Sequence, residues 1–313
     1  MSEKILVLGA SGQIGTDLVE QLREGYGNDK VVATDIRNAS PSVMEGGPFE
    51  TLDAKDGNRM LEIIQKHGIT QVYHLVAMLS ATAEKFPEKG WDLNMESLFH
   101  TLKLAKDGYI HKLYWPSSIA AFGPTTPKTD TPQHTVMDPG TVYGISKLSG
   151  ELWCNYYHKK YGVDVRSIRY PGLISYKTEP GGGTTDYAVD IFHKALKDKK
   201  YECYLAEDTA LPMMYMPDAI KATIGIMEAP AEQVKLRTSY NLAAFSFDPQ
   251  TLAGHIQRHI PEFEMSYNID ERNAIALGWP QSIDDSAARE DWGWQNDYGL
   301  EDMVKDMLKN LKK

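Results

Sequence analysis

The chain has 313 residues, of which 42% are hydrophobic and 24% are charged. This composition is that of an ordinary globular protein and excludes a disordered, collagen-like or coiled-coil chain. The net charge of −10 argues against DNA or RNA as a main ligand, because nucleic-acid binding begins with a basic surface.

The first 190 residues alternate short apolar runs with segments of helical periodicity, a pattern typical of a parallel sheet covered by helices on both faces. Strands are predicted at residues 4–8, 31–35, 71–75, 112–117 and 164–169. Amphipathic helices are predicted at residues 13–23, 58–67, 91–105 and 142–161. The predicted fold class is therefore α/β, with a doubly wound parallel sheet of the Rossmann type.

A glycine-rich turn follows the first predicted strand and opens the first predicted helix. Gly9, Gly12 and Gly15 suit a tight turn, a close approach of backbone to pyrophosphate, and close packing of helix on strand. The helix start, with Gln13 and Ile14, offers free N–H groups and a partial positive charge to phosphates. The turn predicts a dinucleotide site, and a turn that serves packing alone is the alternative.

Asp35 stands at the end of the second predicted strand, 20 residues after Gly15. A carboxylate there can accept hydrogen bonds from the ribose hydroxyls of adenosine and would repel a 2′-phosphate, which favours NAD over NADP. Arg37 follows two residues later and could instead bind that phosphate. We expect NAD to be the cofactor.

Tyr143 and Lys147 lie four residues apart at the start of the predicted helix 142–161, so they share one face. They follow a predicted strand end that carries Ser118, the place where doubly wound sheets bind ligands. A nearby ammonium favours a phenolate, so we expect Lys147 to lower the pKa of Tyr143 from its ordinary value near 10. Tyr143 is the predicted general base, with Ser118 on the same substrate oxygen and Lys147 also on the nicotinamide ribose. A chance surface pair is the alternative.

The regular alternation of predicted strands and helices stops after Tyr170, where proline and glycine become frequent and loops are expected. Shorter elements are predicted at residues 186–197, 201–205, 217–227, 240–243 and 249–259, with an amphipathic tail from residue 301. Residues 1–175 are interpreted as the nucleotide-binding domain, to which later segments return, and residues 176–313 mainly as a small substrate-binding lobe.

The sequence shows no sign of a membrane span, a targeting peptide, a disulfide framework or a metal site. No apolar run approaches the roughly 18 residues of a membrane span, and the apolar run at residues 5–8 leaves no room for a targeting peptide, so a cytoplasmic location without membrane contact is expected. Cys154 and Cys203 are too few for a disulfide framework or zinc site. His255 and His259 are interpreted as a solvated helix face, and no metal is expected.

The glycine-rich turn, Asp35 and the Ser118, Tyr143 and Lys147 set resemble the extended short-chain dehydrogenase/reductase superfamily, in the branch that contains sugar-nucleotide epimerases. The resemblance extends over nearly the whole chain and includes Ser118, Tyr143 with Lys147, and the segment 169–172. It implies further cofactor contacts beyond the turn and Asp35. These are Asp53 and Ala54 beside the adenine, Leu75, Ala77 and Tyr170 along the cofactor, and Asn94 in a supporting hydrogen-bond network.

Within that branch the chain resembles the epimerase-like L-threonine 3-dehydrogenases, most of all in residues 79–84, 115–120, 170–175 and 181–187. The resemblance implies oxidation of the C3 hydroxyl of L-threonine to 2-amino-3-oxobutanoate. Ser80, Ser118, Tyr143, Thr184 and Thr185 are the implied substrate contacts. It also implies a homodimer that packs the helices at residues 91–105 and 142–161 against their mates.

Two other functions stay open at this stage. A sugar-nucleotide epimerase or dehydratase could use the same scaffold and cofactor, although Leu211 stands where such enzymes usually carry an arginine for the diphosphate. A non-enzymatic NAD sensor is the third hypothesis, which the intact Tyr143, Lys147 and Ser118 set disfavours. Trp279 is interpreted as a packing residue, with the mouth of the pocket as the alternative.

Overall fold

The computed structural model describes residues 3–178 and 181–312. Its central sheet is parallel throughout. The strands are, in spatial order, β3 (Phe49–Thr51), β2 (Val31–Asp35), β1 (Ile5–Leu8), β4 (Gln71–His74), β5 (Lys112–Tyr114) and β7 (Asp164–Arg166). The order turns back at β1, so a doubly wound sheet is present as predicted. No helix in the described ranges is long and apolar enough to cross a membrane.

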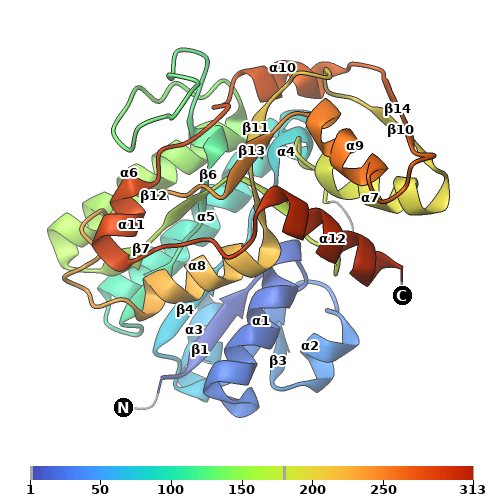
Figure 1. The fold of residues 1–313 in the computed structure, drawn as a ribbon. Helices are drawn as coiled ribbons and strands as arrows, with labels where there is room; N and C mark the ends of the chain where they lie inside the picture. The colour runs from blue at the N-terminus through green and yellow to red at the C-terminus, as the bar shows by residue number, and fades with distance from the viewer. Residues whose placement is uncertain (1–2, 179–180, 313) are drawn as a thin grey trace.

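Helices cover both faces of this sheet because alternate residues of β1 point in opposite directions (Figure 1). Ile5 and Val7 pack against α1 (Gln13–Tyr26) and α8 (Met216–Glu228). Leu6 and Leu8 belong to the opposite core. The helices on that second face are α3 (Gly57–His67), α5 (Pro87–Lys106) and α6 (Val142–Tyr161).

Two predicted strands are each interrupted in the structure. The segment predicted at 112–117 ends as β5 at Tyr114 and resumes as β6 (Ser117–Ser118), because Pro116 has no N–H to continue the ladder. The segment predicted at 164–169 likewise divides into β7 and β8 (Ile168–Tyr170). In a second parallel sheet β8 lies between β6 and β12 (Tyr240–Asn241), so a late segment of the chain returns to the first half.

The expectation of loops directly after Tyr170 is wrong for residues 172–174. Residues Gly172–Ile174 form β9, which pairs with β11 (Leu211–Tyr215), and β11 also pairs with β13 (Phe245–Phe247). Figure 1 shows the remaining late elements gathered above one end of the central sheet, in yellow to red. They are α7 (Tyr187–Lys197), β10 (Lys200–Cys203), α9 (Pro249–Gln257), β14 (Glu264–Tyr267), α10 (Glu271–Leu277) and α12 (Leu300–Leu311).

The short elements that complete the chain were not predicted. They are η1 (Asn28–Lys30), α2 (Pro41–Glu45), α4 (Ser80–Lys85), η2 (Ile119–Ala121) and α11 (Ser286–Trp292). Each of these helices is too short for a reliable hydrophobic period. Among them, α4 and η2 border the cavity described below, because Ser80 and Ile119 line it.

The histidine pair does more than face solvent. His255 Nδ1 and His259 Nε2 lie 2.8 Å and 3.3 Å from the two carboxylate oxygens of Glu301 and so connect α9 and the segment after it to α12. Both cysteines are buried as thiols: Cys154 of α6 lies in the core between this helix and the central sheet, and Cys203 lies in the core of the late elements. No cluster of three or more potential metal ligands occurs in the described part of the chain.

Candidate active site

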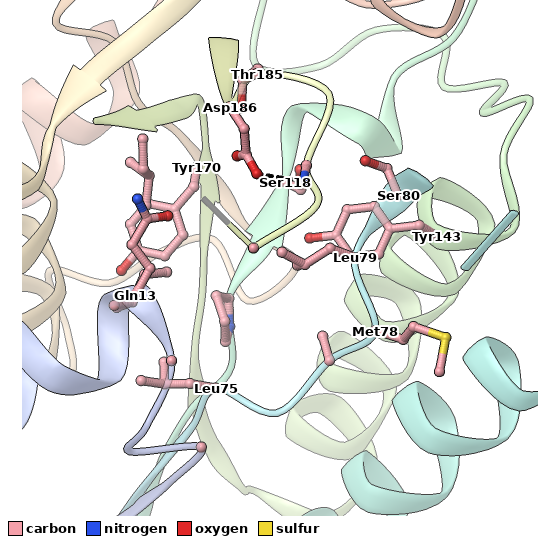
Figure 2. A pocket seen from close by; sticks show the side chains of 18 of the residues that line it. Gln13, Leu75, Met78, Leu79, Ser80, Ser118, Tyr143, Tyr170, Thr185 and Asp186 are labelled. Carbon is pink, nitrogen blue, oxygen red and sulfur yellow. Dashed lines mark hydrogen bonds between the residues drawn. The ribbon is translucent and has the colours of Figure 1, made fainter. Parts of the chain in front are cut away.

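A cavity of about 600 Å³ opens between the carboxyl ends of the central strands and the glycine-rich segment before α7. In Figure 2 the Tyr143 phenol and the Asp186 carboxylate point toward its centre, while Gln13 and Tyr170 lie on the opposite side. Most of the predicted site residues line it together. They are Gly9, Gly12, Gln13, Ile14, Gly15, Arg37, Leu75, Ala77, Ser80, Ser118, Tyr143, Lys147, Tyr170, Thr184 and Thr185.

The glycine-rich turn has the geometry of a phosphate cradle. Gly9 adopts a φ of 85°, which favours glycine, and a Cβ on Gly15 would lie 2.1 Å from the Gly9 carbonyl oxygen. The first turn of α1 carries no acidic residue, so its free N–H groups and partial positive charge stay available to an anion. Gln13 Nε2 is buried, has no hydrogen-bond partner among the described residues and belongs to a cavity-lining side chain. The turn therefore fits the pyrophosphate of a dinucleotide.

Asp35 is held beside this turn at the end of β2. Its Oδ2 accepts a hydrogen bond from the Ser11 backbone N–H at 3.0 Å, and its Oδ1 accepts one from the Arg37 N–H at 3.1 Å. The Arg37 guanidinium is 72% exposed and lies 3.9 Å from the carboxylate. The Asp35 carboxylate is thus held in place, whereas the Arg37 side chain is free to turn toward solvent.

Asp35 and three other predicted cofactor residues lie outside the cavity lining. Asp53 is exposed, accepts a hydrogen bond from the Lys55 N–H, and precedes Ala54, which is buried in the core. Asn94 acts as a brace in α5: its side chain pairs with the Met78 backbone, and its Nδ2 donates to Ser146 Oγ at 3.1 Å. Asn94 thus connects the loop after β4 to the helix that carries Tyr143.

Close packing fixes the start of α6. Thr141 caps the helix by accepting from the Gly144 N–H, and Glu84 of α4 accepts from the Val142 N–H at 2.7 Å. A Cβ on Gly144 would lie 2.1 Å from the Ala120 carbonyl oxygen, and one on Gly150 would lie 2.3 Å from the Trp115 ring. The first half of α6 therefore approaches η2 and the strand ends as closely as backbone allows.

Burial dominates the ionisation of Tyr143. Removal from water raises the pKa of its phenol to about 12, and only the neighbouring Ser118 hydroxyl opposes this. The expected lowering by Lys147 is not found, because the Lys147 Nζ lies 5.6 Å from the centre of the Tyr143 ring and is itself desolvated. Burial lowers the pKa of Lys147 to about 7.

Lys147 is held by two neighbours that precede Ser118 in the chain. Its Nζ donates a hydrogen bond to the Pro116 carbonyl oxygen at 2.6 Å and lies 4.4 Å from the centre of the Trp115 ring. The cation–π contact and the carbonyl both favour the ammonium form. Lys147 therefore holds a defined position although burial weakens its basicity.

The glycine-rich segment before α7 is ordered by Asp186, a residue that the sequence analysis did not select. Its Oδ2 accepts from the N–H groups of Gly182 and Gly183 at 2.8 Å and 2.7 Å. Burial raises the pKa of this carboxyl, and these N–H groups oppose the rise. A sequence signal was available, because an acid three residues after a run of glycines can bind their backbone N–H groups.

Thr184 and Ser80 join this segment to α4. Their hydroxyl oxygens lie 3.2 Å apart, and Tyr204 OH donates to the Thr184 carbonyl oxygen at 3.2 Å while accepting from the Tyr187 N–H. The predicted substrate residues are thus brought together at one end of the cavity. We infer that this end takes the substrate and that the turn of α1 takes the cofactor.

The structure also places Trp279 and Leu211 relative to the cavity. Trp279 lines the cavity, so the pocket-mouth alternative describes it better than packing alone. Leu211 is fully buried in the core of the late elements and does not line the cavity. Among the described lining residues, the basic side chains are Arg37 and Lys147, and Asp186 is the acid. The substrate end therefore offers few groups for a diphosphate.

A dinucleotide cradle, a buried Tyr143–Lys147 pair and a small polar pocket together define an NAD-dependent enzyme of the extended short-chain dehydrogenase/reductase type. The chain belongs to the NAD dependent epimerase/dehydratase family, whose model matches residues 5–243.

Several similar proteins are epimerase-like L-threonine dehydrogenases. The solved GalE-like L-threonine dehydrogenase from Cupriavidus necator in its holo form is 57% identical, covers 98% of this chain and 99% of its own, and gives a TM-score of 0.96. A monomeric L-threonine 3-dehydrogenase from a metagenome is 46% identical with a TM-score of 0.95, each chain covered to 98%. An uncharacterized epimerase/dehydratase from Staphylococcus haemolyticus is 49% identical over 99% of this chain and 98% of its own.

Proposed function

We propose that the protein oxidises the C3 hydroxyl of L-threonine to 2-amino-3-oxobutanoate with NAD. The observation that carries this proposal is the arrangement in Figure 2, where a phenol and a carboxylate face one small space beside the dinucleotide cradle. A free amino acid needs an acceptor for its ammonium group, and Asp186 supplies one. The 45–58% identity to solved L-threonine dehydrogenases supports the same substrate.

The residues of the chain handle the proton of the reaction. Ser118 hydrogen-bonds the C3 oxygen, and the phenolate of Tyr143 accepts the hydroxyl proton. Lys147 fixes the local geometry through the Pro116 carbonyl and contributes positive charge near the phenol. When bound, NAD supplies the acceptor for the hydride that leaves C3. Since burial raises the pKa of Tyr143 to about 12, turnover should increase as the pH rises above neutrality.

The substrate end of the cavity suits a zwitterion. Asp186 faces the ammonium group, and the hydroxyls of Thr184 and Thr185 with the backbone N–H groups of their segment face the carboxylate. Ser80, which is held against Thr184, completes this end.

Replacement of Asp186 by Asn should therefore raise the KM for L-threonine by roughly 10- to 100-fold, because an amide is a weaker partner for an ammonium group. NAD affinity should stay within about twofold, because Asp186 lies away from the α1 turn. Steady-state kinetics and NAD titration by fluorescence separate the two effects. Asp190 of α7, which does not line the cavity, provides a matched control as Asp190→Asn. A KM equal to that of the parent would remove Asp186 from the substrate site.

The decisive assay is the appearance of reduced-nicotinamide absorbance with NAD and L-threonine, run beside L-serine, L-allo-threonine and UDP-galactose. Rapid reduction with L-threonine alone is expected. Epimerisation of UDP-galactose without reduction by any amino acid would favour the sugar-nucleotide alternative, which the family membership also permits.

We further propose that the protein works as a homodimer through the exposed faces of α5 and α6. Leu152 and Trp153 of α6 are 57% and 39% exposed, and Trp91 of α5 is 38% exposed. Large apolar side chains gathered on two adjacent helices commonly mark an interface. The resemblance to the epimerase-like dehydrogenases implies that the partner on this face is a second copy of this chain.

A further inference from the structure

One tyrosine hydroxyl of the late elements bridges the segment before α7 to the first residue of that helix. Tyr204 OH donates a hydrogen bond to the Thr184 carbonyl oxygen at 3.2 Å and accepts one from the Tyr187 backbone N–H at 2.7 Å. Thr185 and Asp186 lie between these two contacts along the chain. The hydroxyl therefore holds both ends of the short stretch that the proposed function places against the substrate.

The start of α7 is capped from a distant part of the chain. Tyr187 is its first residue, and the first N–H groups of a helix have no carbonyl partner within the helix. An Asp at the N-cap ordinarily accepts from such groups, but the Asp186 carboxylate accepts instead from the Gly182 and Gly183 N–H groups. With Tyr204 at the helix start, the Asp186 carboxylate is free to point toward the cavity (Figure 2).

The Tyr204 ring is held in place by two neighbouring side chains. The Arg272 guanidinium of α10 lies 3.1 Å from the ring centre, a cation–π contact, and the Tyr187 ring packs nearly perpendicular to it with ring centres 6.4 Å apart. Arg272 is itself anchored, because its Nη2 donates to Asp270 Oδ2 at 2.6 Å. Packing within the late elements therefore fixes where the Tyr204 hydroxyl lies.

Phenylalanine could fill the space of Tyr204 but could not replace its hydroxyl. Thr184 and Tyr187 are both buried, and a buried backbone carbonyl or N–H group that loses its partner destabilises the conformation that buries it. Burial also raises the pKa of Tyr204, so the hydroxyl stays protonated and able to donate. Without it, the segment before α7 must shift toward other hydrogen-bond partners.

We propose that Tyr204 is a positioning residue for the substrate, whose hydroxyl keeps Thr185 and Asp186 turned toward the cavity. The inference rests on the proposed function, because it assigns Tyr204 a task in the binding of the amino acid. Tyr204 does not line the cavity and acts through the segment that does.

The first test compares the steady-state kinetics of the parent enzyme and Tyr204→Phe, with NAD and L-threonine as substrates. Loss of a hydroxyl that serves two buried backbone groups should raise the KM for L-threonine by roughly 10- to 100-fold. The kcat and the KM for NAD should stay within about threefold, because Tyr143 and the α1 turn lie outside the affected segment. A parental KM for L-threonine, or a loss confined to kcat, would overturn the proposal.

Tyr201→Phe is the matched control. Tyr201 of β10 lies in the same core, and its hydroxyl is buried without a hydrogen-bond partner among the described residues. Its removal should leave the KM for L-threonine within about twofold of the parent. An equal rise of the KM in Tyr201→Phe and Tyr204→Phe would indicate general loosening of the core and would contradict the proposal.

Arg272→Lys tests whether the ring must be held. Lysine keeps the positive charge but loses the planar group that stacks on Tyr204, so the KM for L-threonine should rise by less than in Tyr204→Phe. In the double variant the change at Arg272 should add little, because its influence passes through the Tyr204 hydroxyl. Fully additive effects of the two changes would contradict this route.

Hydrogen exchange measures the segment without any substrate and separates this proposal from the proposed function. In Tyr204→Phe the Tyr187 amide should exchange at least about tenfold faster than in the parent, while the amides of α12 keep the parental rate. If exchange changes in this way but the parent leaves L-threonine unoxidised, the proposed function alone fails. Parental exchange at Tyr187 would refute the role of Tyr204.

Discussion

Tyr143 combines a reactive position with an unfavourable environment. The residue is 9% exposed, and burial raises the pKa of its phenol to about 12, so the phenolate is scarce at neutral pH. Ser118 opposes this effect from within the site, whereas Lys147 stays 5.6 Å from the ring centre. As the proposed proton acceptor, Tyr143 is therefore opposed by its own burial, and its activity should rise with pH.

Tyr143→Phe should reduce kcat by roughly 10²- to 10⁴-fold, because the variant cannot accept the hydroxyl proton. NAD affinity should stay within about twofold, since the ring still fills its place. Stopped-flow absorbance measures the first quantity and fluorescence titration the second. Tyr109→Phe, at a 41% exposed tyrosine outside the cavity, serves as the control. Activity comparable to the parent would show that another group takes the proton.

Asp35 is the residue that we propose determines the choice of NAD over NADP. Asp35→Ser should narrow the preference for NAD over NADP by about tenfold or more, because the carboxylate that would repel a 2′-phosphate is gone while Arg37 remains. The ratio of kcat/KM for the two cofactors measures this change. Asp35→Asn, which removes charge and retains shape, separates repulsion from hydrogen bonding. Unchanged discrimination in both variants would assign the role to a different residue.

At the scale of elements, α1 positions the glycine-rich turn and α6 positions Tyr143. In both helices a glycine allows a close approach to neighbouring residues. The Gly15 position in α1 admits no Cβ beside the Gly9 backbone, and Gly144 and Gly150 let α6 approach η2 and Trp115. Side chains can shift to relieve a clash, but backbone of a tight turn cannot. These contacts therefore set the cofactor cradle and the phenol more rigidly than hydrogen bonds alone.

Gly15→Ala should weaken NAD binding by at least about tenfold and lower the free energy of unfolding by about 1 to 3 kcal/mol, because α1 must move from the turn. Gly25→Ala is the matched control on the same helix. No described atom lies within 4 Å of its added Cβ, so it should be neutral or stabilise by about 0.5 to 1 kcal/mol. Urea unfolding and NAD titration measure both variants. Equal behaviour of the two would contradict the packing argument.

The sequence could predict the elements whose pattern is long and periodic. The helix at 142–161 matches α6, and the α1 turn follows its strand as expected. It could not predict the break at Pro116, because the apolar run continues across it, nor β9, whose partner β11 lies far along the chain. The spacing of Tyr143 and Lys147 places them on one face of the helix. Their burial depends on packing from other elements, so the sequence could not predict that the pKa of Tyr143 is raised and not lowered.

At the scale of the whole molecule, the exposed face of α5 and α6 is the surface that the proposed dimer would cover. A T-shaped contact between Phe99 and Trp153, with ring centres 5.0 Å apart, joins the two helices into one surface. Both helices also support the cavity, through Asn94 in α5 and Tyr143 at the start of α6. A partner on this face would therefore stabilise the elements that hold the proposed catalytic residues.

Leu152→Asp should shift the protein from dimer to monomer, because a charge would be desolvated in the interface. Leu277→Asp is a close control, since Leu277 is 58% exposed on α10, outside the proposed face. Sedimentation equilibrium measures the mass of both variants and the parent. A parent that sediments as a monomer at micromolar concentration would end the dimer proposal and would match the monomeric relative.

The two buried thiols, Cys154 and Cys203, can report local unfolding of the cores in which they lie. Cys154 and Cys203 are both 0% exposed, lie in different cores, and have pKa values that burial raises, so an alkylating reagent should not react with the folded state. Each thiol becomes reactive only when its core opens. Rates of labelling at the two positions, measured by mass spectrometry, would thus tell whether the nucleotide-binding half and the late elements open as one unit or separately.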